Sequence, residues 1–287
     1  MSFLLFANIA KKKNTRNPLF PFTWPPPPGQ NFSMKPKPAA AVILLRDSPE
    51  GPQVLLAKRS PTSPFMPSRH VFPGGNARPG ERPEFAAIRE LWEEAGVVLA
   101  KGRQWPEPTV LHTARSRLAE ANLVDVLQEI GLRPAVEDLA AYSVWTTPSA
   151  RPIRFQTTFF LALLPPGQEP SPDGTEVVEL VWKRPAQALE ENTAGRLHLG
   201  PPQVRILAEL SVAESAEELM GAAASGQLVH VSPVMWTGKD GVRVVLLPWD
   251  KDYPLGRPSC PVLGRPVEPL RASRIVCIAG QWLPYAP

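Results

Sequence analysis

Cysteine is scarce in this chain, and long hydrophobic runs are missing. The 287 residues include only Cys260 and Cys277, which stand in neither the CxxC nor the zinc-ligand spacing. This argues against a disulfide scaffold and a cysteine-based zinc site, and it makes a reducing compartment the default. No apolar stretch approaches the roughly 20 residues that cross a bilayer, so we expect no membrane partner. Proline, in contrast, is abundant at 37 residues, which favours rigid loops over a helical bundle.

The chain also has little net charge outside one segment. Its formal charge is +4, from 31 basic and 27 acidic residues. Residues 1–33 contain Lys11, Lys12, Lys13 and Arg16 and no acid, so the remainder carries equal numbers of both signs. We therefore expect no nucleic-acid-binding face on the folded body.

Residues 1–33 predict a disordered leader that is rich in proline and basic residues. Trp24 precedes the prolines 25–28, a run that favours extended polyproline II structure. A docking arm, and translation starting at Met34, remain alternative interpretations of this segment. Order is expected to begin near Ala39, with the main domain at residues 34–230 and a C-terminal extension at 231–287 packed on it.

Hydrophobic periodicity predicts a chain of strands and helices. A helix over residues 83–95 places Phe85, Ile88, Trp92 and Ala95 on one face, and Gly96 suits its C-terminal cap. The order of elements indicates a mixed α/β or α+β sandwich. We predict strands at 39–46, 54–58, 140–145, 154–164, 176–182, 242–247 and 274–278, a loop at 60–75, and further helices at 114–130, 185–192, 201–210 and 213–224.

Three glutamates cluster on the side of the first helix that lies opposite its apolar stripe. Glu90, Glu93 and Glu94 stand at positions i, i+3 and i+4, so their carboxylates project from one face and repel one another. A hard divalent cation would relieve this repulsion, because Mg²⁺ and Mn²⁺ bind carboxylate oxygens together with substrate phosphates. Gly74 comes shortly before the helix and can aim a main-chain carbonyl at the same ion. Arg89 can pair with Glu93 or orient a neighbouring carboxylate.

This segment resembles the signature of the Nudix hydrolases. That signature is G, five residues, E, seven residues, R-E-U, one residue, E-E, one residue and G-U, where U is aliphatic. All its positions are matched without insertion by Gly75, Glu81, Arg89, Glu90, Leu91, Glu93, Glu94, Gly96 and Val97.

The resemblance implies an α/β/α sandwich with a mixed sheet, here with extra C-terminal helices and strands. It also implies an enzyme that hydrolyses a diphosphate linkage in a nucleoside diphosphate derivative and requires Mg²⁺ or Mn²⁺. Carried onto this chain, the metal ligands would be Glu90, Glu93, Glu94 and the Gly74 carbonyl. One of the glutamates would also act as the base. Arg89 and Glu81 would support the helix.

The residues before this signature resemble those of Nudix enzymes that cleave coenzyme A. Ser60 and the run 72–75 stand at the spacing of that motif, although Pro64 and Ser68 depart from it. The match is closer to the nucleoside diphosphate-linked moiety X motif 19 type, a peroxisomal coenzyme A diphosphatase in mammals. It implies cleavage of coenzyme A or acyl-CoA to 3′,5′-ADP and 4′-phosphopantetheine. The chain ends without the peroxisomal signal of that type, and we expect a cytoplasmic location; a homodimer is compatible with the family.

Three charged residues lead into the expected metal site from one loop. Arg59, Arg69 and His70 are candidates for binding the phosphates of a nucleotide substrate, although solvated loop charge explains them equally well. Glu176 and Glu179 stand where the family can bring a further acid to the metals. Their imperfect alternation does not decide which of the two faces inward.

Other functions remain as alternatives. The first is a diphosphatase for ADP-ribose, a dinucleotide or capped RNA, which the neutral body and the absence of further motifs argue against. The second is a non-catalytic Nudix ligand-binding regulator, although such domains usually lose the glutamates that are all present here. The third is an interaction module that acts through residues 1–33, in which case deleting the leader would abolish function.

Overall fold

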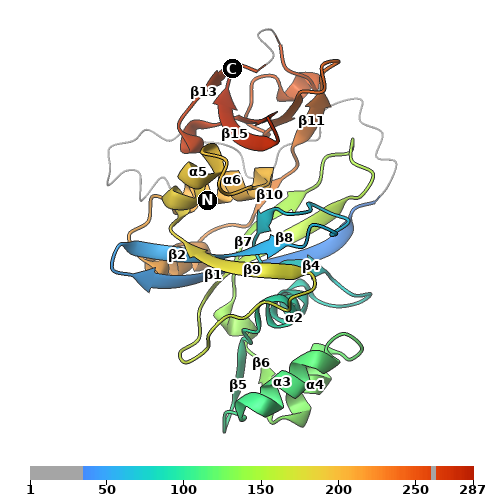
Figure 1. Cartoon of the computed structure of the whole chain (residues 1–287), viewed down its shortest axis with the longest axis vertical. Coiled ribbons are helices and arrows are strands. Elements are labelled where there is room, and N and C mark those ends of the chain that lie inside the picture. Colours follow the sequence, from blue (N-terminus) through green and yellow to red (C-terminus); the bar gives the residue numbers. More distant parts are fainter. Residues whose placement is uncertain (1–34, 260–262) are drawn as a thin grey trace.

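The structure is a computed structural model that describes residues 35–259 and 263–287, so the predicted leader at 1–33 lies outside the described residues. Its centre is an eight-stranded mixed sheet (Figure 1). Along its main path the strand order is β10-β7-β8-β1-β2-β3, while β4 pairs with β1 and β9 with β2. These strands are β1 (Lys37–Ser48), β2 (Gly51–Arg59), β3 (His70–Val71), β4 (Gly74–Asn76), β7 (Ala140–Thr146), β8 (Phe155–Leu163), β9 (Val177–Lys183) and β10 (Val229–Val231).

Strand β1 divides the hydrophobic core between the two faces of this sheet. Ala40, Val42 and Leu44 pack against the face that carries helix α2 (Pro83–Ala95). The alternate residues Ile43 and Leu45 belong to the core on the other face, because successive side chains of a strand point to opposite sides. That second face is covered by α5 (Pro185–Thr193), α6 (Pro201–Leu210) and α7 (Ala216–Ala224). The α/β/α sandwich is therefore confirmed, with α2 on one side and α5 and α6 on the other (Figure 1).

The predicted helix over residues 83–95 is confirmed at both ends. Pro83 occupies its first turn, where a missing N–H leaves no bond unmade. Gly96 adopts a left-handed conformation at φ 71° and donates its N–H to the Trp92 carbonyl, which ends the helix. Ile88, Leu91 and Trp92 are fully buried against the sheet. The helix is thus held rigidly, and its opposite face is left to the charged residues.

The prediction of a single helix over residues 114–130 is wrong. The chain forms α3 (Pro108–Arg117) and α4 (Leu123–Glu129), separated by a turn. Asn122 causes the break, because its side chain accepts hydrogen bonds from the N–H groups of Val124 at 2.8 Å and Asp125 at 3.4 Å and so starts a new helix. The short strands β5 (Ala100–Gly102) and β6 (Leu132–Pro134) pair beside these helices at one end of the molecule (Figure 1).

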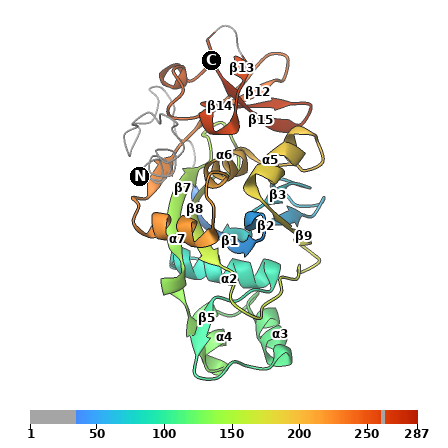
Figure 2. The ribbon, with the colours of Figure 1, turned by 90° about the vertical axis from the view of Figure 1, so that its left-hand side faces the viewer.

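A second sheet lies beyond α5 and α6, at the end of the molecule opposite α3 and α4 (Figure 2). Its order is β11-β12-β14-β15-β13, all antiparallel. Val245, Ile275 and Trp282 join the same core as α6, and Asn192 of α5 donates its side-chain N–H to the Trp282 carbonyl at 2.9 Å. The strands are β11 (Val234–Thr237), β12 (Arg243–Leu246), β13 (Arg265–Pro266), β14 (Arg274–Ile278) and β15 (Gln281–Ala286).

Two smaller differences from the sequence predictions bear on the site. The segment 60–75, expected to be a loop, contains β3 and the start of β4. The helix predicted from residue 213 begins only at Ala216, because Ser215 caps it by accepting from the Glu218 N–H.

Within the described ranges, every helix is too short or too polar to cross a lipid bilayer.

Candidate active site

The two glycines before α2 are placed by strand pairing. Strand β4 runs antiparallel to β1, so that Gly74 pairs with Ala41 and Gly75 with Ala40. A Cβ atom on Gly75 would lie 2.5 Å from the Glu90 Oε2, and one on Gly74 would lie 2.4 Å from the Ala40 carbonyl oxygen. Neither position has room for a side chain, and the backbone of β4 therefore lies directly against the acidic face of α2.

Glu94 is the most deeply buried carboxylate of this face, with 2% of the residue exposed. Its Oε2 accepts a hydrogen bond from the Gly74 N–H at 2.8 Å. Its Oε1 is buried without a hydrogen-bond partner, and the nearest cation is Arg59, whose Nη1 lies 3.8 Å away. Burial, reinforced by the charge of Glu90, raises the pKa of Glu94 to about 8. One oxygen of Glu94 is thus available for a ligand.

Glu90 lies beside Gly75 on the preceding turn of the helix. Burial raises the pKa of its carboxyl to about 7, although Arg89 counteracts the shift. The charges of Glu93 and Glu176 raise this pKa further. Glu90 and Glu94 therefore form a buried acidic pair, and the neighbouring arginines do not offset the effect of burial on their pKa values.

Arg89 organises the charged residues around this pair. Its guanidinium donates to both oxygens of Glu81 at 2.9 and 2.8 Å, to Glu90 at 2.8 Å, to Glu93 at 2.7 Å and to the Asn76 carbonyl at 2.9 Å. Only 3% of Arg89 is exposed. Although burial alone would lower its pKa, these carboxylates raise it, so the side chain stays charged.

Glu93 is turned toward cations rather than toward Glu94. Arg89 binds one of its oxygens, and Arg78 lies 3.4 Å from the other. Arg78 also donates to the Ala121 carbonyl at 2.6 Å, which ties the turn between α3 and α4 to the acidic face. Sequence analysis did not select Arg78. Its only signal was its place three residues before Glu81, whose carboxylate accepts the Arg78 N–H at 2.8 Å.

The structure distinguishes the two glutamates near β9. Glu176 lines the cavity described below, and its charge raises the pKa of both Glu90 and Glu94. Glu179 instead pairs with Lys58 at 3.1 Å on the surface, where half of its side chain is exposed. Glu176 is therefore the residue that faces inward.

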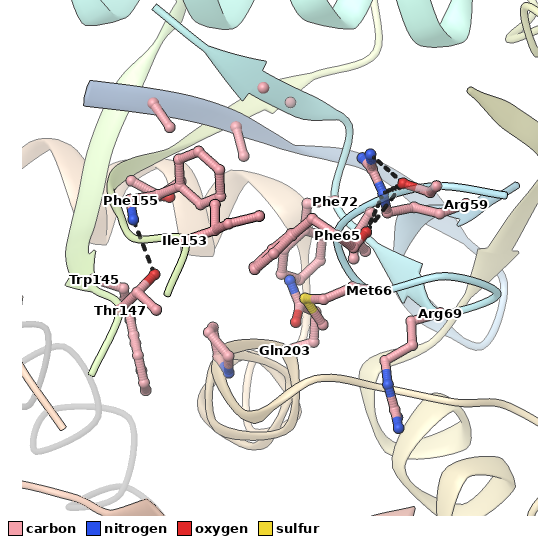
Figure 3. A pocket seen from close by; sticks show the side chains of 18 of the residues that line it. Arg59, Phe65, Met66, Arg69, Phe72, Trp145, Thr147, Ile153, Phe155 and Gln203 are labelled. Atoms are coloured by element: carbon pink, nitrogen blue, oxygen red, sulfur yellow. Dashed lines mark hydrogen bonds between the residues drawn. The ribbon is translucent and has the colours of Figure 1, made fainter. Parts of the chain in front are cut away.

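A cavity of about 1080 Å³ lies beside the acidic face of α2, where Glu90 and Glu93 line it and the buried Glu94 does not. At one end it is lined by Gly75, Glu90 and Glu176. Its middle is apolar, and Figure 3 shows Phe65, Met66 and Phe72 beside Ile153 and Phe155, with the rings of Phe65 and Phe155 in edge-to-face contact at 5.1 Å. Another wall comes from the C-terminal sheet, through Met235, Arg243, Val245 and Trp282, and from Pro233 just before it.

The three predicted substrate-binding residues occupy different places. Arg59 lines the cavity and is held by the Ser63 hydroxyl and the Phe65 carbonyl, each 3.0 Å from its Nε. Arg69 also lines the cavity but points away from Arg59 (Figure 3), and it donates to the Leu199 carbonyl at 2.8 Å and the Gly280 carbonyl at 2.7 Å.

His70 does not line the cavity. It is buried within β3, and burial, together with the charge of Lys58, lowers the pKa of His70 to about 4. The imidazole is therefore neutral at physiological pH.

Trp145 and Gln203 also line the cavity. Trp145 lines it, whereas Trp182 lies under Arg46, with its ring centroid 4.3 Å from the guanidinium carbon. Gln203 at the start of α6 is 5% exposed and lines the cavity, and its Oε1 is buried without a hydrogen-bond partner. The run 201–203 also resembles the motif 19 type, but sequence analysis did not select Gln203 as a site residue.

The donor groups fit a hard divalent cation. Across residues 35–259 and 263–287, no three acidic, histidine or cysteine side chains already converge on one point. The buried pair Glu90 and Glu94 nevertheless offers carboxylate oxygens, one of them unbonded, beside the backbone of Gly74. Oxygen ligands that carry excess negative charge are the donors that Mg²⁺ and Mn²⁺ prefer.

Comparison with known proteins places these features among related chains. A sequence model described as the NUDT19 Nudix domain matches residues 79–210. The acyl-coenzyme A diphosphatase NUDT19 of Homo sapiens is 28% identical over 289 residues, which cover 76% of each chain, and that of Gallus gallus is 29% identical over 72% of this chain and 75% of its own.

A putative nudix hydrolase 7 from Caenorhabditis elegans is 34% identical over 181 residues, and the match spans 60% of the length of that protein. Among solved structures, a NUDIX hydrolase from Alicyclobacillus acidocaldarius superposes with a TM-score of 0.60 at 24% identity. The superposition covers 68% of this chain and all of the other, and the two chains share a fold.

Proposed function

The chain belongs to the Nudix hydrolase family, close to NUDT19, and is a Nudix pyrophosphohydrolase; from this premise we propose that it cleaves the diphosphate of coenzyme A or acyl-CoA. The products are 3′,5′-ADP and 4′-phosphopantetheine or its acyl derivative. The observation that supports this proposal is one cavity that joins Glu90, Glu93 and Glu176 to Arg59 and a long apolar wall. Such a cavity can hold a diphosphate and both of its large substituents.

The residues that would hold Mg²⁺ or Mn²⁺ are Glu90, Glu94 and the Gly74 carbonyl, with Glu93 and Glu176 close by. A bound divalent cation would neutralise charge on the diphosphate and lower the pKa of a water. Arg89 keeps Glu90 and Glu93 in place through its hydrogen bonds. The buried core side of α2 prevents the acidic face from moving away from β4.

The reaction adds water across the P–O–P bridge. The water oxygen forms a bond to one phosphorus, the bond from that phosphorus to the bridging oxygen breaks, and its electron pair stays on the bridging oxygen. A carboxylate among Glu90, Glu93 and Glu94 accepts the proton of the attacking water. Arg59, 3.8 Å from Glu94, is placed to bind the diphosphate beside these groups.

A substrate panel tests this proposal. Purified protein is incubated with Mg²⁺, Mn²⁺ or chelator and with coenzyme A, acyl-CoA, ADP-ribose, NADH and diadenosine polyphosphates, and the products are separated. We expect coenzyme A or acyl-CoA to give 3′,5′-ADP only when the metal is present. Rapid hydrolysis of ADP-ribose without cleavage of coenzyme A would assign the chain to another branch of the family. Binding without hydrolysis of any substrate would identify a ligand-binding regulator.

A further inference from the structure

The C-terminal sheet forms one wall of the substrate cavity. Met235 of β11, Arg243 and Val245 of β12 and Trp282 of β15 line the same space as Glu90. All four residues lie outside the segment 79–210 that matches the Nudix domain. The substrate site of this chain therefore includes residues that the catalytic segment does not supply.

Arg243 is the cation that this sheet brings to the wall. Its Nη2 donates to the Cys277 Sγ at 3.2 Å, and its guanidinium carbon lies 5.2 Å from the ring centroid of Trp282. Arg69 also lines the cavity, and its guanidinium donates to the Gly280 carbonyl in the turn between β14 and β15. The two arginines thus face the same region from β12 and from the loop before β3.

The positive charge of these arginines is not neutralised by the protein. Over the described part of the chain, neither Arg69 nor Arg243 forms an ion pair with a carboxylate. Burial lowers the pKa of Arg69, and the charge of Arg243 lowers it further, while Cys277 acts in the opposite direction. Two like charges that line one cavity, neither of them paired with a carboxylate, are an arrangement that a bound anion stabilises.

We propose that Arg243 and Arg69 together bind a phosphomonoester, the 3′-phosphate of coenzyme A. This inference rests on the proposed function, since the diphosphate itself is assigned to the acidic pair and Arg59. A substrate whose diphosphate lies at Glu90 and Glu94 then carries a second anion in the same cavity, and the arginine pair is the site that receives it. The adenosine end of the substrate consequently lies against the C-terminal sheet.

The first test compares two substrates that differ only in the 3′-phosphate. Arg243→Gln removes the charge and keeps a polar side chain that can contact Trp282, and Arg265→Gln in the exposed strand β13 is the matched control. For coenzyme A we expect Arg243→Gln to raise KM by about tenfold or more, with kcat unchanged, because a charge-assisted contact is lost. For dephospho-coenzyme A, KM should stay within twofold. Equal losses on both substrates, or no loss on coenzyme A, would overturn the assignment.

The second test does not depend on catalysis. Calorimetry measures the binding of 3′,5′-ADP and of 5′-AMP to the wild-type protein and to both variants. The wild type and Arg265→Gln should bind 3′,5′-ADP at least tenfold more tightly than 5′-AMP, and Arg243→Gln should lose this preference. A wild type that binds both nucleotides equally would refute the phosphate site even if coenzyme A is cleaved. A wild type that prefers 3′,5′-ADP but leaves coenzyme A intact would retain the site and refute only the proposed reaction.

Discussion

Replacing Glu94 with glutamine should make the metal-free protein more stable at neutral pH while removing its activity. The carboxyl has a pKa of about 8 in the folded chain against an ordinary value of 4.5. The folded state therefore holds a proton that the unfolded chain releases. Below about pH 4.5 the carboxyl is protonated in both states and costs no stability. As the pH rises from 4.5 to 8, the unfolded chain ionises while the folded chain keeps its proton, so the free energy of unfolding falls.

The expected magnitude follows from the pKa difference. Each pH unit between the unfolded and folded pKa values corresponds to about 1.4 kcal/mol. At pH 7, ionisation of Glu94 in the unfolded chain therefore lowers the free energy of unfolding of the wild type by about 3 kcal/mol. Glutamine is neutral at every pH and avoids this loss. It keeps an oxygen for the Gly74 N–H that Glu94 now binds at 2.8 Å. The turnover of the Glu94→Gln variant should nevertheless fall by about 10²-fold or more, because a charge of the acidic pair is gone.

Urea unfolding in chelator between pH 5 and pH 8.5 measures the effect. The difference in unfolding free energy between Glu94→Gln and the wild type should grow by about 2.5 kcal/mol from pH 5 to pH 7. The exposed Glu120→Gln serves as the control and should follow the wild type. Added Mg²⁺ should stabilise the wild type more than the Glu94→Gln variant. Parallel pH curves for the two proteins, or a glutamine variant that is less stable at pH 8 in chelator, would refute the reasoning.

Four further substitutions test three separate parts of the site. Glu176→Gln should lower kcat at least tenfold, because the charge of Glu176 acts on the acidic pair. Glu179→Gln should keep kcat within twofold of the wild type, since the exposed ion pair of Glu179 with Lys58 contributes little. Steady-state kinetics measures both, and equal effects would contradict the inward placement of Glu176. Gly75→Ala should displace the Glu90 carboxylate, because the new Cβ would lie 2.5 Å from the Glu90 Oε2. Turnover should fall by about 10²-fold, as kinetics would measure, while circular dichroism should show an intact fold. Gln203→Leu should leave the unfolding free energy unchanged or raise it by about 1 kcal/mol, because it removes a buried oxygen that has no partner; a clear loss in urea titration would show that the amide is bonded.

The parts of the fold that the sequence predicted are those with strong local patterns. The apolar run at the start of the main domain and the spacing of Ile88 and Trp92 each specify one element, and both elements are present. The prediction of a single helix over residues 114–130 failed because hydrophobic periodicity does not register capping. The side chain of Asn122 accepts the Val124 N–H and starts a second helix there. They also failed for β4, since three residues can be recognised as a strand only through their pairing with β1.

The candidate site shows the same division. The positions of Glu90 and Glu94 on one helix face follow from helical geometry, and the structure places them together. The i, i+4 spacing predicted the pair of Arg89 with Glu93, whereas the contact of Glu93 with Arg78 could not be predicted, because Arg78 reaches it from outside the helix. The cavity wall made by Arg243 was equally inaccessible to sequence analysis, since it depends on how the C-terminal sheet packs on α5 and α6.

The pairing of β1 with β8 has a consequence for how the chain acquires its shape. The two strands run parallel, with Ala41 opposite Phe159, so the centre of the sheet joins segments that are far apart in the sequence. During synthesis, β1 emerges first, and its β8 edge stays unpaired until the ribosome has released everything up to β8. Contacts of such long sequence separation slow folding and leave hydrophobic edges exposed while the chain is incomplete. Newly made chains should therefore depend on chaperones until β8 has emerged, and truncations that end before Phe155 should aggregate rather than fold.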